Sequence, residues 1–403
     1  MSKHHSLESI PVPVEKLGRQ ANTVQRIAAV VGSLGLLLCG GAFFWNRTEF
    51  FQSYMLALIY WGGFSIGGLG ILLMHHTVGG RWGVTIRRLL EAQMRTLPLI
   101  AVMLIPVFVF GLGDLYPWAR PGEVAHNAVL QHKQGYLNTP FFVARTVLYF
   151  ALWLFWGYRV SRMADRQDET GDPTLRERMR AFSAPGVLIF TLTASFAYID
   201  WILSADAEFF STVYGAMILI GDVLQTFAFS IILLVLVSGK DGFKGRVNAQ
   251  VLHDLGNLMF AFVIFWTYLS ASQLIIVWPG NLPQEIGWYL VRVNGFWKYF
   301  AATIALSMFA LPFLLLLSQA RKRNPVRLMR VAIFILIARA IDVLWIVEPT
   351  YRRNGFTMYW TDAAVFIGIG GIWLYVFMGQ LRRRPLLPLQ DSRIAPPVSE
   401  AAA

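Results

Sequence analysis

The sequence predicts an all-α integral membrane protein with about ten transmembrane helices. Hydrophobic residues make up 56% of the 403-residue chain and charged residues only 14%, a balance typical of polytopic membrane proteins. Apolar segments long enough to cross a bilayer recur along the whole chain. Basic residues gather in alternate connections between those segments. Together these observations favour a membrane-embedded helical bundle over a soluble domain.

The apolar segments follow a polar N-terminal tail, 1–26, that lacks the apolar core and the cleavage site of a signal peptide. Each segment is long enough for a hydrocarbon core of about 30 Å with some tilt. With a second polar tail at 381–403, we expect one transmembrane domain at 27–380. The predicted spans are 27–45, 51–74, 97–113, 141–158, 184–204, 209–237, 253–278, 297–318, 327–348 and 360–380.

The basic connections predict the orientation of the chain. Loops rich in Lys and Arg stay in the cytoplasm, and an even number of spans then places both tails there. The same loop charge accounts for the net charge of +12, so no nucleic-acid partner is expected. The basic stretches are the N-terminal tail, Arg81–Arg95, Arg159–Arg180, Lys240–Arg246, Arg321–Arg330 and Arg382–Arg393.

Two outer connections, 114–140 and 279–296, are rich in Trp, Tyr, Pro, Asn and Gly. Their aromatic residues have two interpretations. They anchor the chain at the membrane interface, or they form a docking surface for an extracytoplasmic partner.

An internal repeat is indicated by two short similar sequences, AYIDWIL around Asp200 and RAIDVLWI around Asp342. They close two predicted four-helix bundles of the same orientation, 51–204 and 209–348. Internal repeats are common in membrane proteins that hold a site between two halves.

The segment IFILIARAIDVLWIVE, Ile333–Glu348, combines an apolar sequence with Arg339, Asp342 and Glu348. A charge in hydrocarbon costs several kcal/mol unless it finds a partner or a wet cavity. Arg339 and Asp342 are three residues apart, so they share one face of a helix and can pair. The pair either fixes helix register or takes part in function; buried ion pairs are poor stabilisers, which favours function.

Other ionisable residues extend this pattern into two predicted half-paths for protons. By depth along the helices, Asp222 and Arg339 lie near the middle of the membrane, and the histidines lie at the cytoplasmic ends. The acids at helix ends, Asp206, Glu208 and Asp362, are instead interpreted as snorkelled or helix-capping residues. The proton-path candidates are Asp200, Asp222, Arg339, Asp342, Glu348, His253, Asp254, His75 and His76.

Several kinds of site are not expected in this chain. Cys39 is the single cysteine, which excludes an intrachain disulfide and an all-cysteine iron–sulfur or zinc site. No two histidines face each other at depth to hold a haem, and no HExxH or GK[ST] motif occurs. The glycine-rich GGFSIGGLG is interpreted as a close helix contact, and Asn257, Thr267, Ser270 and Gln273 as interhelical hydrogen-bonding or water-holding positions.

Four stretches carry a resemblance: HHTVGGRWG (75–83), the FFSTVYGA region (204–216), HDLGNLMFAFVIFWTYLSASQ (253–273) and WPGNLPQEIGWYLVRVNGFW (278–297). With them the sequence resembles the F-type quinone-binding membrane subunit of alternative complex III, an NrfD-like relative of the polysulfide-reductase-like membrane subunits. The resemblance implies two four-helix bundles with flanking helices, in a bacterial cytoplasmic membrane.

The resemblance further implies a subunit of a respiratory or photosynthetic complex that oxidises menaquinol or ubiquinol and reduces a periplasmic cytochrome c or similar carrier. Its partners would be a paralogous membrane subunit, an iron–sulfur subunit and c-type cytochrome subunits, which hold the iron–sulfur clusters and haem c. This subunit would serve proton translocation, with the better-defined quinol pocket in the paralogue. The chain departs from the pocket pattern in having no histidine deep in the outer half.

Two other functions fit the residues. The chain could be a purely structural membrane anchor, or a secondary transporter with its site between the repeats. Transporters usually break their helices with paired Gly or Pro residues at midplane, whereas Pro106 and Pro312 do not match in position and the long helices are mostly uninterrupted. A transporter should purify alone, and a complex subunit with haem-containing partners.

Overall fold

The computed structural model describes residues 14–206, 208–238, 247–353 and 355–387. Within these ranges the chain is helical and has no strand, and nine of its helical stretches are long and apolar enough to cross a membrane. The all-α multi-pass fold is therefore confirmed. Half of the predicted N-terminal tail, most of the predicted C-terminal tail and Lys240–Arg246 lie outside the described residues.

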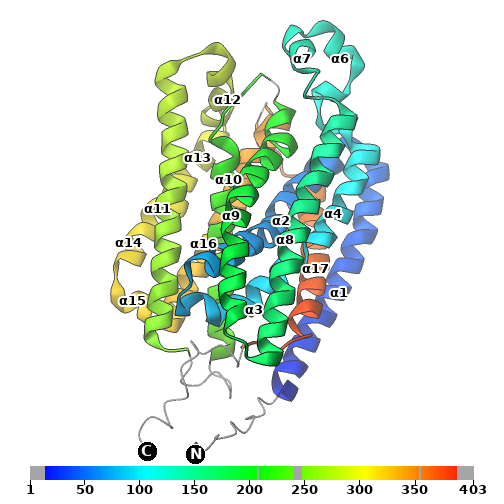
Figure 1. Cartoon of the computed structure of the whole chain (residues 1–403). Helices are drawn as coiled ribbons and strands as arrows, with labels where there is room; N and C mark the ends of the chain where they lie inside the picture. The colour runs from blue at the N-terminus through cyan, green and yellow to red at the C-terminus, as the bar shows by residue number, and fades with distance from the viewer. Residues whose placement is uncertain (1–13, 207, 239–246, 354, 388–403) are drawn as a thin grey trace, which may run out of the picture.

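The long helices run side by side in one bundle (Figure 1). The tenth predicted span lies in α16, which carries several charged residues and is not among the nine apolar stretches. Helix α16 nevertheless packs inside the bundle, against α10, α2 and α13. The membrane-crossing elements are α1 (Val14–Trp45), α2 (Arg47–Val78), α4 (Leu97–Pro106), α8 (Thr139–Thr170), α9 (Thr174–Trp201), α10 (Tyr214–Ser238), α11 (Ala249–Gly280), α13 (Trp297–Ile304) with α14 (Leu311–Leu317), α16 (Pro325–Tyr351) and α17 (Trp360–Leu381).

Asparagine starts four of these helices. The side chains of Asn46, Asn138, Asn248 and Asn324 each accept a hydrogen bond from the backbone N–H three residues later, at 3.0–3.2 Å. Such a cap satisfies one of the backbone donors that a helix N-terminus leaves without a partner. The first helix begins earlier than predicted, because α1 already runs through 14–26.

Two spans contain a π-helical turn, whereas the other eight are continuous α-helices, so the described long helices are mostly uninterrupted, as expected. The third span passes from α4 through a π-helical turn, Val107–Gly111, to α5 (Leu112–Leu115), and the eighth passes through a π-helical turn, Ala305–Ala310, between α13 and α14. Pro106 and Pro312 adjoin these turns. Proline has no N–H for the helical ladder, and such gaps favour local π-bulges.

The basic stretch Arg81–Arg95 is not a surface connection, as the sequence had indicated, but mostly a buried helix, α3 (Arg81–Met94). It folds back against α2 after Gly79 and Gly80, which both have positive φ. Its arginines have partners: Arg87 lies 2.8 Å from Asp168 of α8, and Arg88 lies 2.6 Å from Glu91. An acidic residue of α8 and one of α3 itself thus make a basic segment compatible with burial.

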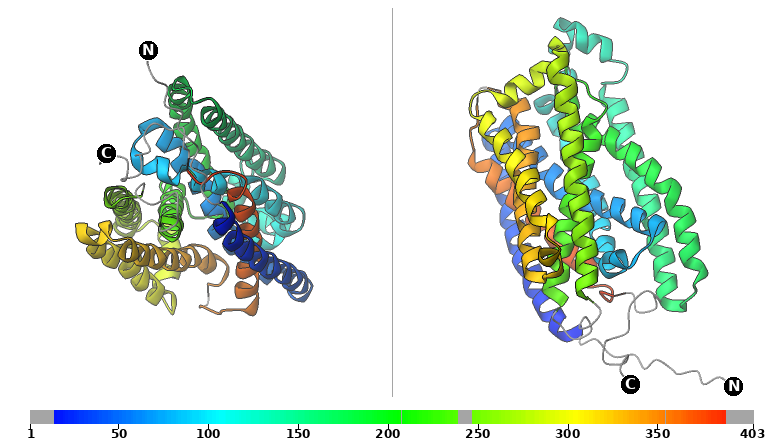
Figure 2. Two further views of the ribbon diagram at one scale, coloured as in Figure 1. Left: turned by 90° about the horizontal axis from the view of Figure 1, so that it is seen from below. Right: turned by 90° about the vertical axis from the view of Figure 1, so that its left-hand side faces the viewer.

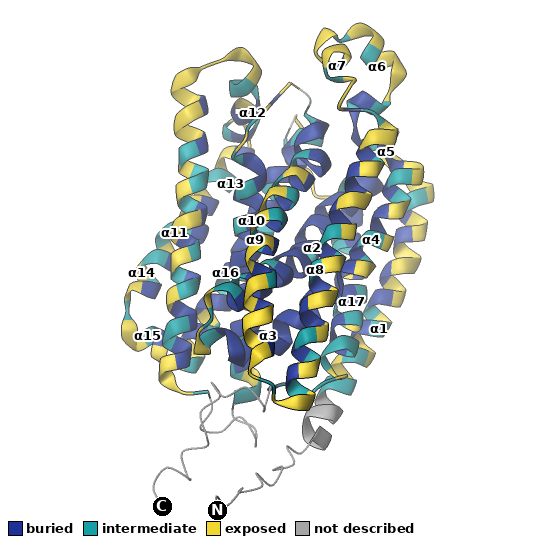
Figure 3. Cartoon of the chain, viewed as in Figure 1, coloured by how far each residue is buried: buried dark blue, intermediate teal, exposed yellow. Residues whose placement is uncertain are grey.

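Helix α2 is the core of the bundle, and most of its residues are buried (Figure 3). Its glycines let α10 approach closely. A Cβ on Gly63 would lie 2.5 Å from a carboxylate oxygen of Asp222, and one on Gly67 would lie 2.6 Å from the Asp222 carbonyl oxygen. The interpretation of GGFSIGGLG as a close helix contact is confirmed.

The outer connections hold the short helices α6 (Pro121–His126), α7 (Ala128–Lys133) and α12 (Pro283–Val293). Their large aromatic residues point into the chain's own core: Tyr116, Trp118, Trp288 and Tyr289 are all buried. Arg292 ties α12 to α16 by donating to the carbonyl oxygen of Ile346 at 2.7 Å. The surface exposed at this end includes α6 and α7, which project from the bundle (Figure 1), and the segment 278–284 before and at the start of α12.

The ends of the bundle differ in charge. Helix α1 begins and α17 ends at the end that also holds α3 and α15 (Gln319–Arg323), which we call the basic end (Figure 1). The division into bundles 51–204 and 209–348 stays a prediction. In the first predicted bundle the first helix, α2, packs on the last, α9; in the second the first helix, α10, packs on the last, α16.

A reporter that is active only in the periplasm tests the orientation. Fused after Arg384, at the basic end, it should give no signal, and fused after Gly122, in exposed α6, it should be active. Activity after Arg384 would overturn the predicted topology.

Candidate functional site

Arg339 of α16 joins two carboxylates in the interior of the bundle. Its Nη2 atom donates to Oδ1 of Asp222 at 3.1 Å, and its Nη1 atom donates to Oδ2 of Asp342. All three side chains are at least 98% buried. We call Asp222, Arg339 and Asp342 the central cluster. The predicted Arg339–Asp342 pair is confirmed, and Asp222 of α10 is its third member.

Two further helices reach the central cluster. The Tyr198 hydroxyl of α9 donates to Oδ2 of Asp222, and the Trp266 indole of α11 lies beside Asp342. Arg339 also donates to the carbonyl oxygen of Ile218 at 3.2 Å. The cluster therefore connects α9, α10, α11 and α16.

Gly221 makes room for the guanidinium group. A Cβ at this position would lie 2.8 Å from Nε of Arg339, closer than nonbonded atoms can approach. The guanidinium thus lies against the backbone of α10, one residue before Asp222. Any side chain at Gly221 would displace Arg339 from its carboxylate partners.

The central cluster contains one permanent cation and two carboxylates. If both carboxylates are ionised, the group carries one net negative charge in the interior of the bundle, and burying net charge is unfavourable. One proton shared by Asp222 and Asp342 makes the cluster neutral. The arrangement can therefore hold a proton and release it, with Tyr198 as the neighbouring hydroxyl.

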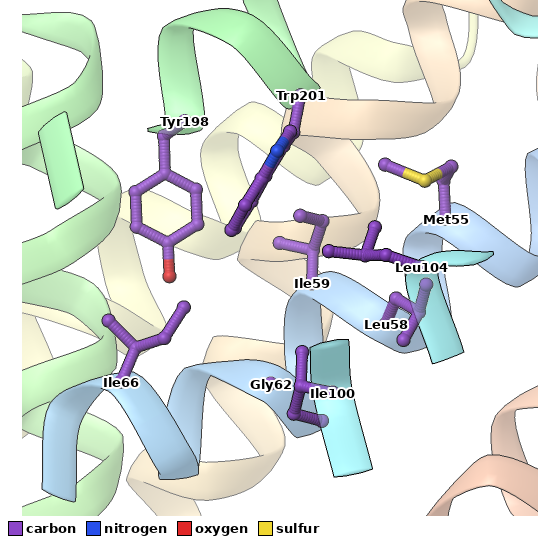
Figure 4. A pocket seen from close by; sticks show the side chains of 9 residues that line it. All are labelled: Met55, Leu58, Ile59, Gly62, Ile66, Ile100, Leu104, Tyr198 and Trp201. Carbon is purple, nitrogen blue, oxygen red and sulfur yellow. The ribbon is translucent and has the colours of Figure 1, made fainter. Parts of the chain in front are cut away.

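A small cavity adjoins Tyr198 (Figure 4). The space open to the centres of water molecules is about 10 Å³, room for about one water. This is far below the roughly 300–1,000 Å³ of ordinary small-molecule pockets, so the cavity does not fit a quinone ring. It is lined by Met55, Leu58, Ile59, Gly62, Ile66, Ile100, Leu104, Tyr198 and Trp201.

Asp200 belongs to a second, separate cluster. Arg145 of α8 binds it with two parallel hydrogen bonds of 2.8 and 2.9 Å, and Tyr149 donates to it at 2.8 Å. Asp200 thus has its own cation, whereas Asp342 shares Arg339 with Asp222. The sequence similarity around Asp200 and Asp342 does not extend to how the two acids are paired.

Glu348 belongs to a third cluster, toward the end of the bundle opposite the basic end. Arg352 lies 2.9 Å from Glu348 and 2.7 Å from Asp362 of α17. Asp362 also accepts from the backbone N–H of Tyr359 at 2.9 Å and from Ser53 at 2.6 Å. The capping role of Asp362 is confirmed, and Arg352 adds an ion pair that ties α16 to α17.

The histidine candidates lie toward the helix termini at the basic end. His75 and His76 are buried at the end of α2, and the His75 ring is 5.3 Å from the Trp82 ring. His253 lies at the start of α11, 3.7 Å from Asp254 and within 3.3 Å of Asn257. The central cluster, by contrast, lies in the interior of its helices α10 and α16.

The polar positions on α11 divide in two. Asn257 accepts a hydrogen bond from Lys322 at 2.6 Å and Gln273 accepts one from Ser211 at 3.3 Å, which confirms contacts to other segments. The interhelical interpretation is wrong for Thr267, which donates to the Val263 carbonyl of its own helix.

Sequence reasoning missed Tyr198 and the partners supplied by Arg145 and Arg352. Arg145 carried a signal, because an arginine within an apolar span needs an acidic partner. Tyr198 carried no such signal in the sequence, since tyrosine is common in membrane helices.

No group of three or more metal-ligating side chains occurs in the described part of the chain. No protein-family model matches the sequence, and no curated protein matches it either.

Proposed function

We propose that this chain is a membrane subunit of a quinol-oxidising electron-transfer complex, in which the central cluster serves proton translocation. The observation that carries the proposal is the buried group of Asp222, Arg339 and Asp342, with two carboxylates for one cation. The four stretches that resemble a membrane subunit of alternative complex III support the choice of complex.

A purely structural role explains the cluster poorly. Replacing a buried ion pair by well-packed apolar residues is often neutral or stabilising, so such a pair is weak support for stability. Ionisable residues within membrane helices are rare, and they typically mark proton or substrate pathways. The neighbouring Tyr198 hydroxyl adds a group through which a proton can move.

Quinol oxidation itself is assigned to partners in this proposal. The cavity next to Tyr198 is far smaller than a small-molecule pocket, and no residue of this chain is assigned to quinone. Iron–sulfur clusters, haem c and the menaquinol or ubiquinol site would belong to the other subunits. The acceptor would be a periplasmic cytochrome c or a similar carrier.

The test is Asp342→Asn in the complex purified from native membranes. The amide keeps the shape of the carboxylate but cannot take part in proton exchange. We expect the complex to assemble. In vesicles, either its coupled turnover should fall about tenfold, or its proton release per electron should fall to the one proton per electron that quinol oxidation itself releases. Asp206→Asn, at an acid near the bundle end that pairs with Arg353 at 3.5 Å, is the matched control and should leave both values unchanged.

Wild-type turnover and proton stoichiometry in Asp342→Asn would contradict the proton role and support a structural anchor. Purification of the chain alone, without haem-containing partners, would contradict membership of the complex and favour a transporter.

A further inference from the structure

A large pocket opens at the basic end, away from the central cluster. Its volume is about 750 Å³, and α8, the α3–α4 junction and the end of α17 form its walls. Three arginines line it, Arg95, Arg162 and Arg384, against one acid, Asp165. The lining therefore carries a surplus of two positive charges. Arg162 bonds only weakly to the neutral Tyr158 hydroxyl, at 3.3 Å.

The acids near the pocket do not balance these cations. Asp165 pairs with Arg384 and lies 3.7 Å from Arg95 and 3.8 Å from Arg88, so three arginines share one carboxylate. Glu91 lies 3.7 Å from Arg384 but already pairs with Arg88 at 2.6 Å. Burial and the neighbouring Arg95 lower the pKa of Arg384 to about 10. An anion in the pocket would relieve the repulsion between the guanidinium groups.

A buried hydroxyl also lines the pocket. Ser161 is 95% buried, and its Oγ atom has no hydrogen-bond partner in the described part of the chain. A buried polar group without a partner is unfavourable by about 1–3 kcal/mol. A ligand oxygen beside Ser161 would satisfy it.

The opposite wall is apolar and continues into the lipid-facing surface. Met94, Pro98 and Leu154 line the pocket. On α8 the exposed side chains of Leu148, Phe155 and Tyr158 lie on one face of the helix that leads to it. An acyl chain can follow this face while its headgroup stays among the arginines.

We propose that this pocket binds an anionic phospholipid, with its phosphate on Arg95, Arg162, Arg384 and the Ser161 hydroxyl and one acyl chain along Met94 and Leu154. Guanidinium groups bind phosphate through charge-assisted, often paired hydrogen bonds. Basic pockets between transmembrane helices on the cytoplasmic side suit anionic headgroups. The apolar wall distinguishes this ligand from a free phosphate, which would leave it unoccupied.

The experiment measures retained lipid by native mass spectrometry on the purified full-length chain, or on its complex, in mixed micelles of phosphatidylglycerol and phosphatidylcholine. The wild-type protein should retain phosphatidylglycerol at least about tenfold more than phosphatidylcholine. Arg162→Gln, at an exposed arginine whose loss should not unfold the chain, is expected to weaken retention about tenfold, the equivalent of one charge-assisted hydrogen bond. Ser161→Ala should weaken it severalfold.

Arg180→Gln is the matched control, because Arg180 is an exposed arginine of α9 that does not line the pocket. It should retain phosphatidylglycerol as the wild type does. Equal retention of the two lipids, equal loss in Arg180→Gln and Arg162→Gln, or full retention in both Arg162→Gln and Ser161→Ala would overturn the proposal. Displacement of the lipid by millimolar inorganic phosphate would also overturn it, since it would identify a site for a soluble anion.

Discussion

Replacement of Arg339 with alanine is expected to leave little folded protein in the membrane. The substitution removes the guanidinium that serves both Asp222 and Asp342 and leaves their carboxylates buried without a cation. Removing one partner of a buried ion pair destabilises a protein by about 3–5 kcal/mol. The measurement is the yield of folded protein after detergent extraction, together with its thermal unfolding temperature.

A variant of the central cluster without charged side chains distinguishes two causes of instability: unbalanced buried charge and lost packing. The triple variant Arg339→Met, Asp222→Asn, Asp342→Asn has no buried charge left, and we expect it to recover most of the folded yield. It should still fail to translocate protons beyond those that quinol oxidation releases, because neither carboxylate of the central cluster remains. A triple variant as unstable as Arg339→Ala would show that the guanidinium stabilises the fold through shape and hydrogen bonds, such as that to Ile218.

Gly35→Val is expected to separate α1 from α17. These two helices pack closely side by side (Figure 2). A Cβ on Gly35 would overlap the Cα of Gly368, and it would lie 3.1 Å from the backbone nitrogen of Gly368. Because the obstructing atoms are backbone, the helices must move apart, and overpacking of this kind typically costs about 1–3 kcal/mol.

The control for this prediction is on the same helix. A side chain at Gly41 meets no atom within 4 Å, so Gly41→Val should leave the unfolding temperature nearly unchanged, whereas Gly35→Val should lower it by several degrees. Equal unfolding temperatures for the two variants would show that the α1–α17 contact tolerates separation and contributes little to stability.

Local features of the chain could be predicted from the sequence. The lengths of the apolar segments identified the spans, and all ten predicted spans overlap helical stretches of the bundle. The Arg339–Asp342 pair was predictable because both residues lie on one helix, three positions apart. The close helix contact through GGFSIGGLG was predictable because small residues in a span permit close approach.

The partners supplied by other helices could not be predicted. Asp222 lies 117 positions from Arg339 in the sequence, and the two meet only because α10 and α16 pack together with one particular rotation about their axes. The burial of Arg87 in α3 depended in the same way on Asp168 of α8.

The sequence by itself thus determined that this is a helical membrane bundle with charges in its interior, because span length and local spacing follow from chain geometry. Only the tertiary structure decided which charges meet. It placed Asp222 with Arg339 and Asp342, gave Asp200 its own arginine, and gathered three arginines around a pocket at the basic end. The physical reason is that hydrophobic periodicity specifies which residues are buried, whereas the rotation and packing of each helix specify their neighbours.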